Sequence, residues 1–189
     1  MVVSTLFEQS HGLGLDEESR LVDRAVTGDE SSFVTLYHRY YNKVYSIAKG
    51  ILLYAEEAED VTQEIFTLAY RNLSRFDRRS KFSTWLFRIA VNRSIQESRK
   101  NKGRRNNVPL GDEVNDVAES TVVENHDPQV SEAMAKLLPP DRAILTLFYW
   151  DELSLQEVGE SLGCSANAAK TRLFRARERF RDVYEGIEQ

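Results

Sequence analysis

The sequence lacks the features that would build a disulfide framework, a structural zinc site or a membrane span. It contains one cysteine, Cys164, so no internal disulfide can form, and its three histidines are too scattered for metal-ligand spacing. No stretch approaches the roughly 18 consecutive apolar residues of a membrane span, and the N-terminus has no basic start followed by an apolar block. We therefore expect no metal or cofactor and no membrane insertion.

Signatures of catalysis are also missing. There is no glycine-rich phosphate loop, no histidine-based metal set and no nucleophile placed beside a base. The acidic residues between Glu56 and Asp60 could bind magnesium in principle, but the dipole of the helix they begin explains them more simply. An enzyme acting on DNA or phosphate is therefore disfavoured, and we expect no catalytic activity.

Charge is unevenly distributed along the chain. The net charge is -5, yet residues 1–70 carry -7, residues 71–105 carry +10, residues 106–141 carry -7 and residues 142–189 carry -1. A basic block attracts phosphate groups, whereas acidic blocks repel them. The alternation predicts separate surfaces for different partners rather than one uniformly solvated surface.

Helical periodicity dominates, and no run alternates cleanly enough to indicate a strand. We predict helices over about 16–27, from a cap at Asp29 to about residue 51, from about residue 56, and over about 81–102. Residues 106–128 are acidic, contain Gly and Pro, and indicate a linker. Helices resume at about residue 129. The prediction is an all-α fold of two small helical domains, 16–105 and 129–189, joined by a flexible acidic linker, with residues 1–15 as an N-terminal extension.

The second predicted domain contains a helix-turn-helix pattern. Ser154 and Glu157 form a capping box, Gly163 lies in a tight turn, and Ser165 caps a last helix that ends near residue 185. One face of this helix is an apolar stripe, predicted to lie inward, of Ala166, Ala169, Leu173, Ala176, Phe180, Val183 and Tyr184. The opposite face suits the DNA major groove, since its amide and guanidinium groups can read purine edges. That face carries Asn167, Lys170, Thr171, Phe174 and Arg175, whereas Arg172, Arg177, Arg179 and Arg181 suit phosphate contacts. A surface helix rich in arginine is the plainer alternative.

A second candidate site lies in the basic block, where cationic side chains are interleaved with aromatic ones in RFDRRSKFSTWLFRIAVNRS. This composition suits single-stranded or melted nucleic acid, because an unstacked base can be clasped while its backbone is neutralised. For Phe82 and Trp85, core packing is the simpler interpretation. We expect base contact from the loop 76–81, with Asn92 within reach on the following helix.

Three segments together resemble a known family. They are DVTQEIF (60–66), FSTWLFRIAVN (82–92) and LSLQEVGESLGCSANAAKTRLFRARE (153–178), and in this order they resemble the bacterial extracytoplasmic-function (ECF) sigma factors over about residues 16–181. The resemblance implies a cytoplasmic, non-catalytic factor that binds core RNA polymerase and directs promoter recognition, DNA melting and transcription initiation. The alternative is a helix-turn-helix regulator that binds duplex DNA independently of polymerase. It leaves the basic aromatic loop and the acidic helix face around Gln63 without a role.

The resemblance also implies three binding surfaces. The first domain would bind the beta-prime clamp helices and open the minus-ten element, the second would read the minus-thirty-five element and touch the beta flap, and we expect an anti-sigma factor as a further partner. Where the family commonly has Gly-Thr-Val, this chain has Asn167-Ala168-Ala169, which offers an amide in place of a threonine hydroxyl. The candidate residues are Asp60, Gln63 and Glu64 for polymerase; Phe76, Arg78, Arg79, Ser80, Lys81, Arg88 and Asn92 for minus-ten DNA; and Asn167, Lys170, Thr171, Arg172, Arg175 and Arg179 for minus-thirty-five DNA.

Overall fold

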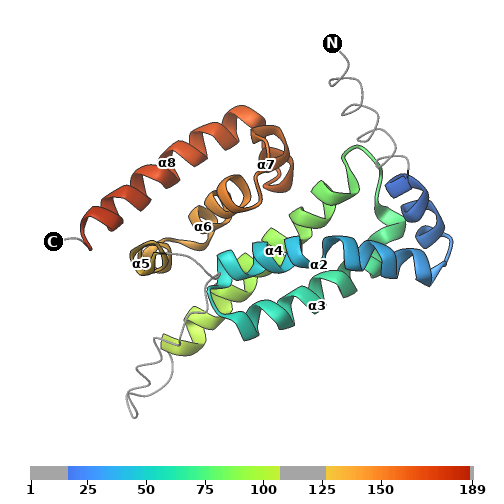
Figure 1. Ribbon diagram of the computed structural model, residues 1–189, viewed down its shortest axis with the longest axis horizontal. Coiled ribbons are helices and arrows are strands. Elements are labelled where there is room, and N and C mark those ends of the chain that lie inside the picture. Colours follow the sequence, from blue (N-terminus) through green and yellow to red (C-terminus); the bar gives the residue numbers. More distant parts are fainter. Residues whose placement is uncertain (1–16, 107–126, 188–189) are drawn as a thin grey trace.

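A computed structural model describes residues 17–106 and 127–187, and within these ranges every regular element is a helix (Figure 1). This confirms the all-α fold class. The predicted extension 1–15 and most of the predicted linker lie outside the described residues. After a helix over 17–26, the N-terminal half contains α2 (Glu30–Leu52), α3 (Ala55–Asn72), a 3-10 turn η1 (Leu73–Arg75) and α4 (Phe82–Asn106). The C-terminal half contains α5 (Pro128–Lys136), α6 (Pro139–Leu145), the π-helical η2 (Thr146–Trp150), α7 (Leu155–Ser161) and α8 (Ala166–Glu185).

The starts of α2, α7 and α8 follow from capping residues, as the sequence predicts. The Asp29 carboxylate accepts a hydrogen bond from the Ser31 backbone N–H, and hydrogen bonds from Ser31 and Ser32 hold the pKa of Asp29 well below its usual range. Ser154 and Glu157 form the predicted capping box at the start of α7. The Ser165 hydroxyl caps α8 by accepting from the Ala168 N–H.

The core of the N-terminal half lies between α2, α3 and α4, which pack on one another (Figure 1). Val44, Ile47, Ala48 and Ile51 of α2 are completely buried there, at the three- and four-residue spacing that the sequence shows. Phe82 is buried and packs against the half-buried Trp85, with ring centroids 5.7 Å apart. Core packing is thus the role that the structure gives to both aromatic rings.

The C-terminal half is built around α8, which packs on α5, α6 and α7. Leu173 and Ala176 are buried on its inner face, but Ala166, predicted to lie inward, is exposed. The reason is a close backbone approach: a Cβ on Gly159 of α7 would lie 2.8 Å from the Cys164 carbonyl and 3.2 Å from the Ala166 nitrogen. The backbone of Ala166, rather than its side chain, therefore faces α7.

The two halves pack on each other. Helices α2 and α4 contact α6, and in addition α2 contacts η2 and α4 contacts α7. Figure 1 shows α6 and α7 alongside α2 and α4, with α8 on the far side of α6. Over the residues described, no helix is long and apolar enough to cross a membrane. The same residues contain no group of three or more His, Cys, Asp or Glu side chains arranged to hold a metal ion.

Candidate nucleic-acid interface

The helix-turn-helix of the C-terminal half has the geometry that the sequence predicts. Helix α7 ends at Ser161, and Gly163 turns the chain with φ of +67°, a left-handed conformation that glycine adopts without strain. Helix α8 then begins at Ala166 and packs against α7. The turn is short because Gly159 leaves room for it, so the two helices are held in a fixed relative orientation.

The outward face of α8 carries the predicted reading residues, and all of them are exposed. Thr171 and Arg175 lie about one turn apart, and the Thr171 hydroxyl donates a hydrogen bond to the Asn167 carbonyl at 3.1 Å. Phe174 lies on the same face and is 59 % exposed, which is unusual for a large apolar side chain. An apolar group here suits contact with a thymine methyl group. The sequence places Phe174 on this face but assigns it no role, although an aromatic residue in a polar stripe is itself a signal.

The arginines of α8 fall into two groups. Arg179 donates two hydrogen bonds to the buried Asp141 carboxylate, of 2.8 and 2.5 Å, and this pairing raises the pKa of the guanidinium. Arg177 lies over the ring of Phe148 at 5.3 Å. Arg172 and Arg175, by contrast, have no ion-pair or hydrogen-bond partner within 17–101 and 127–187. Within the described residues, Arg172 and Arg175 are therefore arginines of α8 without an ion-pair partner, whereas Arg179 is held by its pair with Asp141.

The loop 76–81 is more strongly tied into the fold than the sequence suggests. Phe76 is half-buried, and its ring packs on Trp85 at 5.3 Å and on Phe82 at 5.9 Å. Arg78, with φ of 61°, pairs with Asp23 of the helix over 17–26. Arg79 is 89 % exposed at its side chain, and its one ion pair within the described residues is with Asp77, at 3.3 Å.

The remaining minus-ten candidates lie next to the C-terminal half. Lys81 forms an ion pair with Glu157 of α7 at 2.9 Å, and Ser80 is half-buried. Arg88 of α4 lies against the turn of the helix-turn-helix, since a Cβ on Gly163 would lie 3.2 Å from its Nη2. Asn92 is exposed one turn further along α4. The structure thus brings minus-ten candidates together with the element expected to read the minus-thirty-five sequence.

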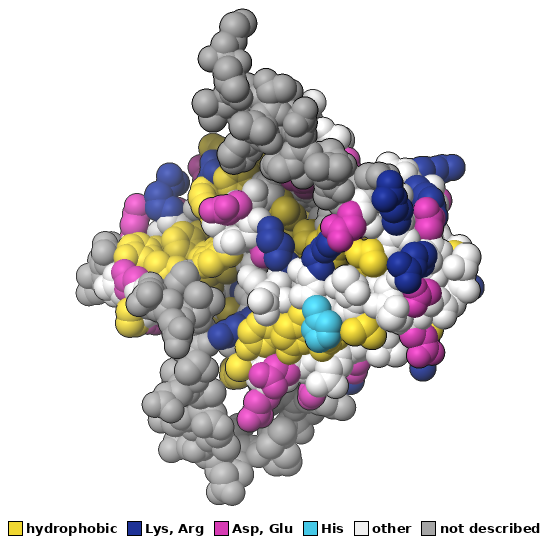
Figure 2. Space-filling view, turned by 45° about the vertical axis from the view of Figure 1, so that its right-hand side comes forward, with side chains coloured by type: hydrophobic (Ala, Val, Ile, Leu, Met, Phe, Trp, Pro, Cys, Tyr) yellow, Lys and Arg dark blue, Asp and Glu magenta, His cyan; other side chains and the backbone are white. Residues whose placement is uncertain are grey.

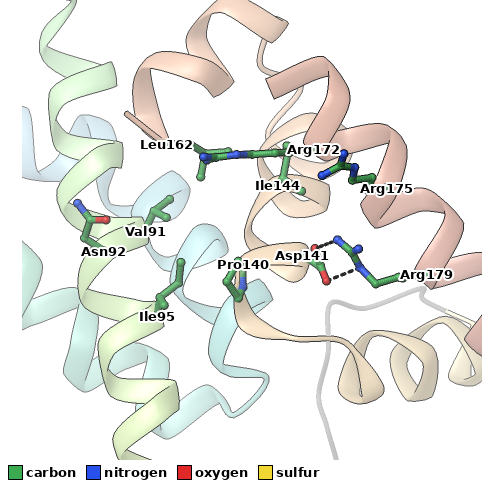
Figure 3. A pocket seen from close by; sticks show the side chains of 10 residues that line it. All are labelled: Val91, Asn92, Ile95, Pro140, Asp141, Ile144, Leu162, Arg172, Arg175 and Arg179. Atoms are coloured by element: carbon green, nitrogen blue, oxygen red, sulfur yellow. Dashed lines mark hydrogen bonds and ion pairs between the residues drawn. The ribbon is translucent and has the colours of Figure 1, made fainter. Parts of the chain in front are cut away.

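One cavity joins the two sets of candidates. We name it the shared cavity; its volume is about 340 Å³, and it lies between α4, α6 and α8 (Figure 3). Arg172 extends from α8 toward α4, and the Arg179–Asp141 pair forms one wall (Figure 3). Its lining residues are Val91, Asn92, Ile95, Pro140, Asp141, Ile144, Leu162, Arg172, Arg175 and Arg179.

The polymerase candidates form a separate surface on α3. Asp60, Gln63 and Glu64 are all exposed. Glu64 accepts a hydrogen bond from Arg93 of α4 at 2.6 Å, and Arg93 also pairs with Glu97 at 2.9 Å.

On the face shown in Figure 2, basic side chains are interspersed with acidic ones rather than gathered in one patch. The basic segment 71–105 is thus partly neutralised by carboxylates of other helices, namely Asp23, Glu64 and Glu157.

Comparison with known proteins decides the family. The model of Sigma-70 region 2 matches residues 36–104, and that of Sigma-70, region 4 matches residues 128–180. The ECF RNA polymerase sigma factor SigW of Bacillus subtilis (strain 168) is 36 % identical over 167 residues, which are 82 % of this chain and 89 % of that relative. The chain belongs to the ECF RNA polymerase sigma factors.

Two solved structures have the same fold as this sigma factor. The structure of CnrH in complex with the cytosolic domain of CnrY matches with a TM-score of 0.68 and 23 % identity, over 90 % of this chain and 98 % of that one. The sigma factor RpoE in complex with the anti-sigma factor NepR from Bartonella quintana matches with a TM-score of 0.63 and 19 % identity, over 81 % and 96 %. The predicted function, that of an ECF sigma factor in transcription initiation, is confirmed.

Proposed function

We propose that this sigma factor binds core RNA polymerase through the exposed face of α3, at Asp60, Gln63 and Glu64. Acidic and amide groups on one solvent-facing helix surface suit a basic partner surface, and the model of region 2 spans them. We propose the beta-prime clamp helices as the partner surface of this domain, residues 16–105. The protein then acts in the bacterial cytoplasm, where core polymerase transcribes, as an initiation factor without catalytic activity.

In the proposed mechanism, the same domain opens the minus-ten element. The loop 76–81 supplies exposed cations, Arg79 above all, and α4 adds Arg88 and Asn92. Cations neutralise the backbone of an unpaired strand, and Asn92 can donate to and accept from a base edge. Phe76 supports the loop from its aromatic cluster and keeps these groups in place.

The domain 129–189 reads the minus-thirty-five element and touches the beta flap. The observation that carries this proposal is the outward face of α8, on which Lys170, Phe174 and Arg175 are exposed and Arg175 has no partner within the described ranges. A guanidinium presented on a helix of this kind can hydrogen-bond a guanine in the major groove through two donors. Asn167, Thr171 and Arg172 complete this face, with Arg172 suited to phosphate.

We also propose that an anti-sigma factor regulates the protein. RpoE from Bartonella quintana, which has the same fold, forms a complex with the anti-sigma factor NepR. Such a partner would bind surfaces that polymerase or DNA also needs.

Run-off transcription with core RNA polymerase and a pool of promoter variants tests the proposed function. We expect transcripts that depend on this chain and that share a minus-ten and a minus-thirty-five sequence. The double variant Lys170→Glu/Arg175→Glu should abolish them. The control Lys136→Glu, at an exposed position of α5 where Lys136 pairs with Glu132, should retain them. A regulator acting independently of polymerase would bind duplex DNA yet form no complex with core enzyme, and that result would overturn the proposal.

A further inference from the structure

The shared cavity has an apolar interior and a cationic rim. Its volume of about 340 Å³ lies within the range of small-molecule sites in proteins. Val91 of α4 and Ile144 of α6 line it and are almost completely buried, whereas Arg172 and Arg175 of α8 line it and are exposed. Figure 3 shows the arginines on the α8 side and Val91 on the α4 side. A small ligand can therefore meet charge at the rim and hydrocarbon further in.

Positive charge is in excess in this lining, which contains three guanidinium groups and a single carboxylate. The carboxylate, that of Asp141, accepts a hydrogen bond from Arg179 at each of its oxygens, of 2.8 and 2.5 Å. Within the described residues, Arg172 and Arg175 have no ion-pair or hydrogen-bond partner. The lining thus has two positive charges that no neighbouring carboxylate neutralises, and a dianion complements them.

The spacing of the two arginines suits a phosphate group. Arg172 and Arg175 are three residues apart on α8, which makes their side chains neighbours on the helix, with Cβ atoms about 5 to 6 Å apart. Like charges held this close repel each other, and an anion bound between them removes the repulsion. Guanidinium groups also bind phosphate through two parallel hydrogen bonds each.

The wall opposite the arginines suits a nucleobase. Ile95 of α4 is half-buried there, and Pro140 and the half-buried Leu162 add apolar surface. Such side chains can cover the face of a planar ring. Asn92 of α4 lines the same cavity and is exposed, and its amide can both donate to and accept from the edge of a base.

Contacts beside the cavity fix its walls. Arg142 of α6 donates from Nε to the Ile51 carbonyl of α2 at 2.8 Å and from Nη2 to the Ser98 hydroxyl of α4 at 3.1 Å. A Cβ added to Gly50 of α2 would lie 2.6 Å from the Cγ2 of Thr146, so only glycine fits there. Because α6 is held against α2 and α4, a ligand finds the walls in place, and binding costs little ordering of the protein.

We propose that the shared cavity binds a nucleoside monophosphate, with its phosphate between Arg172 and Arg175 and its base against Ile95 and near Asn92. A phosphate monoester has a second pKa of about 6, so it is a dianion at neutral pH and matches the two unneutralised charges. Formation of this site requires neither polymerase nor promoter. Because Arg172 and Arg175 are also proposed to contact DNA, the nucleotide competes with the minus-thirty-five element for them, and this consequence rests on the proposed function.

Titration calorimetry of the full chain at about pH 7.5 with AMP, GMP, CMP and UMP tests the site. We expect at least one nucleotide to bind with a Kd below about 1 mM, and at least about tenfold more tightly than its nucleoside and than inorganic phosphate. The reason is that only the nucleotide reaches both the arginines and the apolar wall. Failure of all four nucleotides to bind below about 1 mM, or equally tight binding of inorganic phosphate, would overturn the proposal.

Matched variants separate the cavity from the general charge of α8. Arg172→Gln should weaken binding of the nucleotide at least about tenfold. Lys170→Gln removes the same charge from the same helix outside the lining and should leave the affinity unchanged. Equal losses for these two variants would show an unspecific attraction of anions and would overturn the site.

A second pair of variants tests the apolar wall. Ile95→Ala should weaken binding of the nucleotide about threefold or more and leave the affinity for inorganic phosphate unchanged, because phosphate has no base to pack there. Ile89→Ala, at another partly buried position of α4 outside the lining, is the control. Unchanged nucleotide affinity in Ile95→Ala would remove the base from this wall and contradict the proposal.

Run-off transcription with limiting sigma factor tests the competition. The nucleotide at about three times its Kd for the parent should lower transcription about fourfold with the parent and about twofold with Ile95→Ala, while effects on polymerase itself are equal in both. Unchanged transcription with the parent would overturn the competition. Absence of any transcript before the nucleotide is added is instead a failure of the proposed function, and the calorimetry, which uses neither polymerase nor DNA, is independent of it.

Discussion

Arg179 of α8 binds the Asp141 carboxylate of α6 through two parallel hydrogen bonds, and Asp141 is only 8 % exposed. A two-donor guanidinium contact fixes both distance and orientation. This pair therefore sets the position of the outer part of α8 relative to α6, and the reading face of α8 is placed by a contact on its other side.

Replacing Arg179 by alanine should lower the free energy of unfolding by about 1 to 3 kcal/mol, because the Asp141 carboxylate would stay buried without its partner. Urea unfolding measures the change. Arg181→Ala is the control, since the ion pairs of Arg181 are exposed and should contribute little. Unchanged stability together with a weaker salt dependence of DNA binding would instead assign Arg179 to a phosphate contact.

Arg175→Ala should change which minus-thirty-five sequences are transcribed. Losing a two-donor base contact should weaken recognition by about 1 to 3 kcal/mol and relax the preference at one position. Arg172→Ala, at the flank, should weaken all sequences alike and lower the salt slope by about one unit. Transcription from one promoter library at two salt concentrations separates these results. A uniform loss for Arg175→Ala would contradict base reading.

Two residues of the loop 76–81 should have separable roles: Phe76 stabilises the fold, and Arg79 contacts the melted DNA strand. Phe76→Ala should destabilise the N-terminal half, because its ring packs on Trp85 and Phe82. Arg79→Ala should leave the free energy of unfolding unchanged yet reduce promoter melting, because its side chain is exposed and, among the described residues, forms an ion pair with Asp77 alone. Permanganate reactivity of unpaired thymines measures melting. Normal reactivity with Arg79→Ala would place strand capture elsewhere.

Charge reversal on α3 should weaken assembly with core polymerase. Asp60→Lys combined with Gln63→Ala is preferred to reversal of Glu64, since Glu64 also holds Arg93 and its reversal would disturb α4. Glu59→Lys is the control, as Glu59 lies near Tyr41 and Tyr45 of α2; burial above all, and the charge of Glu59 in smaller part, raises the pKa of both tyrosines. Co-purification with core enzyme measures assembly. Equal recovery of both variants would remove α3 from the polymerase surface.

Stability should fall as pH rises from about 4 to about 7 because of Asp151. Burial raises the pKa of Asp151 from 3.8 to about 7, although the charge of Lys43 and a hydrogen bond from Ser46 oppose the shift. The folded chain then keeps a proton that the unfolded chain releases in this range, so the free energy of unfolding decreases and levels off above pH 7. Asp151→Asn should remove this dependence. Urea midpoints at about pH 5 and about pH 8 measure this dependence. The same change of midpoint with pH in the parent protein and in Asp151→Asn would contradict it.

Most of the fold could be predicted because it depends on local patterns. The buried positions of α2 and α3 recur every three or four residues, and Asp29, Ser154 and Ser165 mark helix starts through hydrogen bonds to residues two or three away. The prediction for Ala166 is wrong because a wheel of side-chain directions does not include the backbone approach of Gly159. Local chemistry is readable from sequence, whereas close packing between elements is not.

The candidate site was less predictable, since the sequence does not distinguish an arginine that forms an ion pair within the protein from one that is available to DNA. Arg175 and Arg179 are one helical turn apart, and only the fold shows that Arg179 meets a carboxylate 38 positions earlier. Arg142 likewise gives no sequence signal of its contacts with Ile51, 91 positions away. The contacts of Arg142 and Arg179 depend on how the helices and the two halves pack. The spacing of residues along the chain does not specify this packing.

The number of residues in the π-helical segment η2, more than their identity, determines how α7 and α8 are oriented relative to α6. The Thr146 carbonyl accepts from the Asp151 N–H, five residues on, so this turn holds one residue more than an α-helical turn. Deleting any one residue from 147–150 would allow ordinary α-helical hydrogen bonds but rotate α7 and α8 by about 100° relative to α6. Thr146 would still face Gly50, while the helix-turn-helix would point elsewhere. Natural sequence variation at η2 should therefore consist of substitutions, with insertions and deletions excluded.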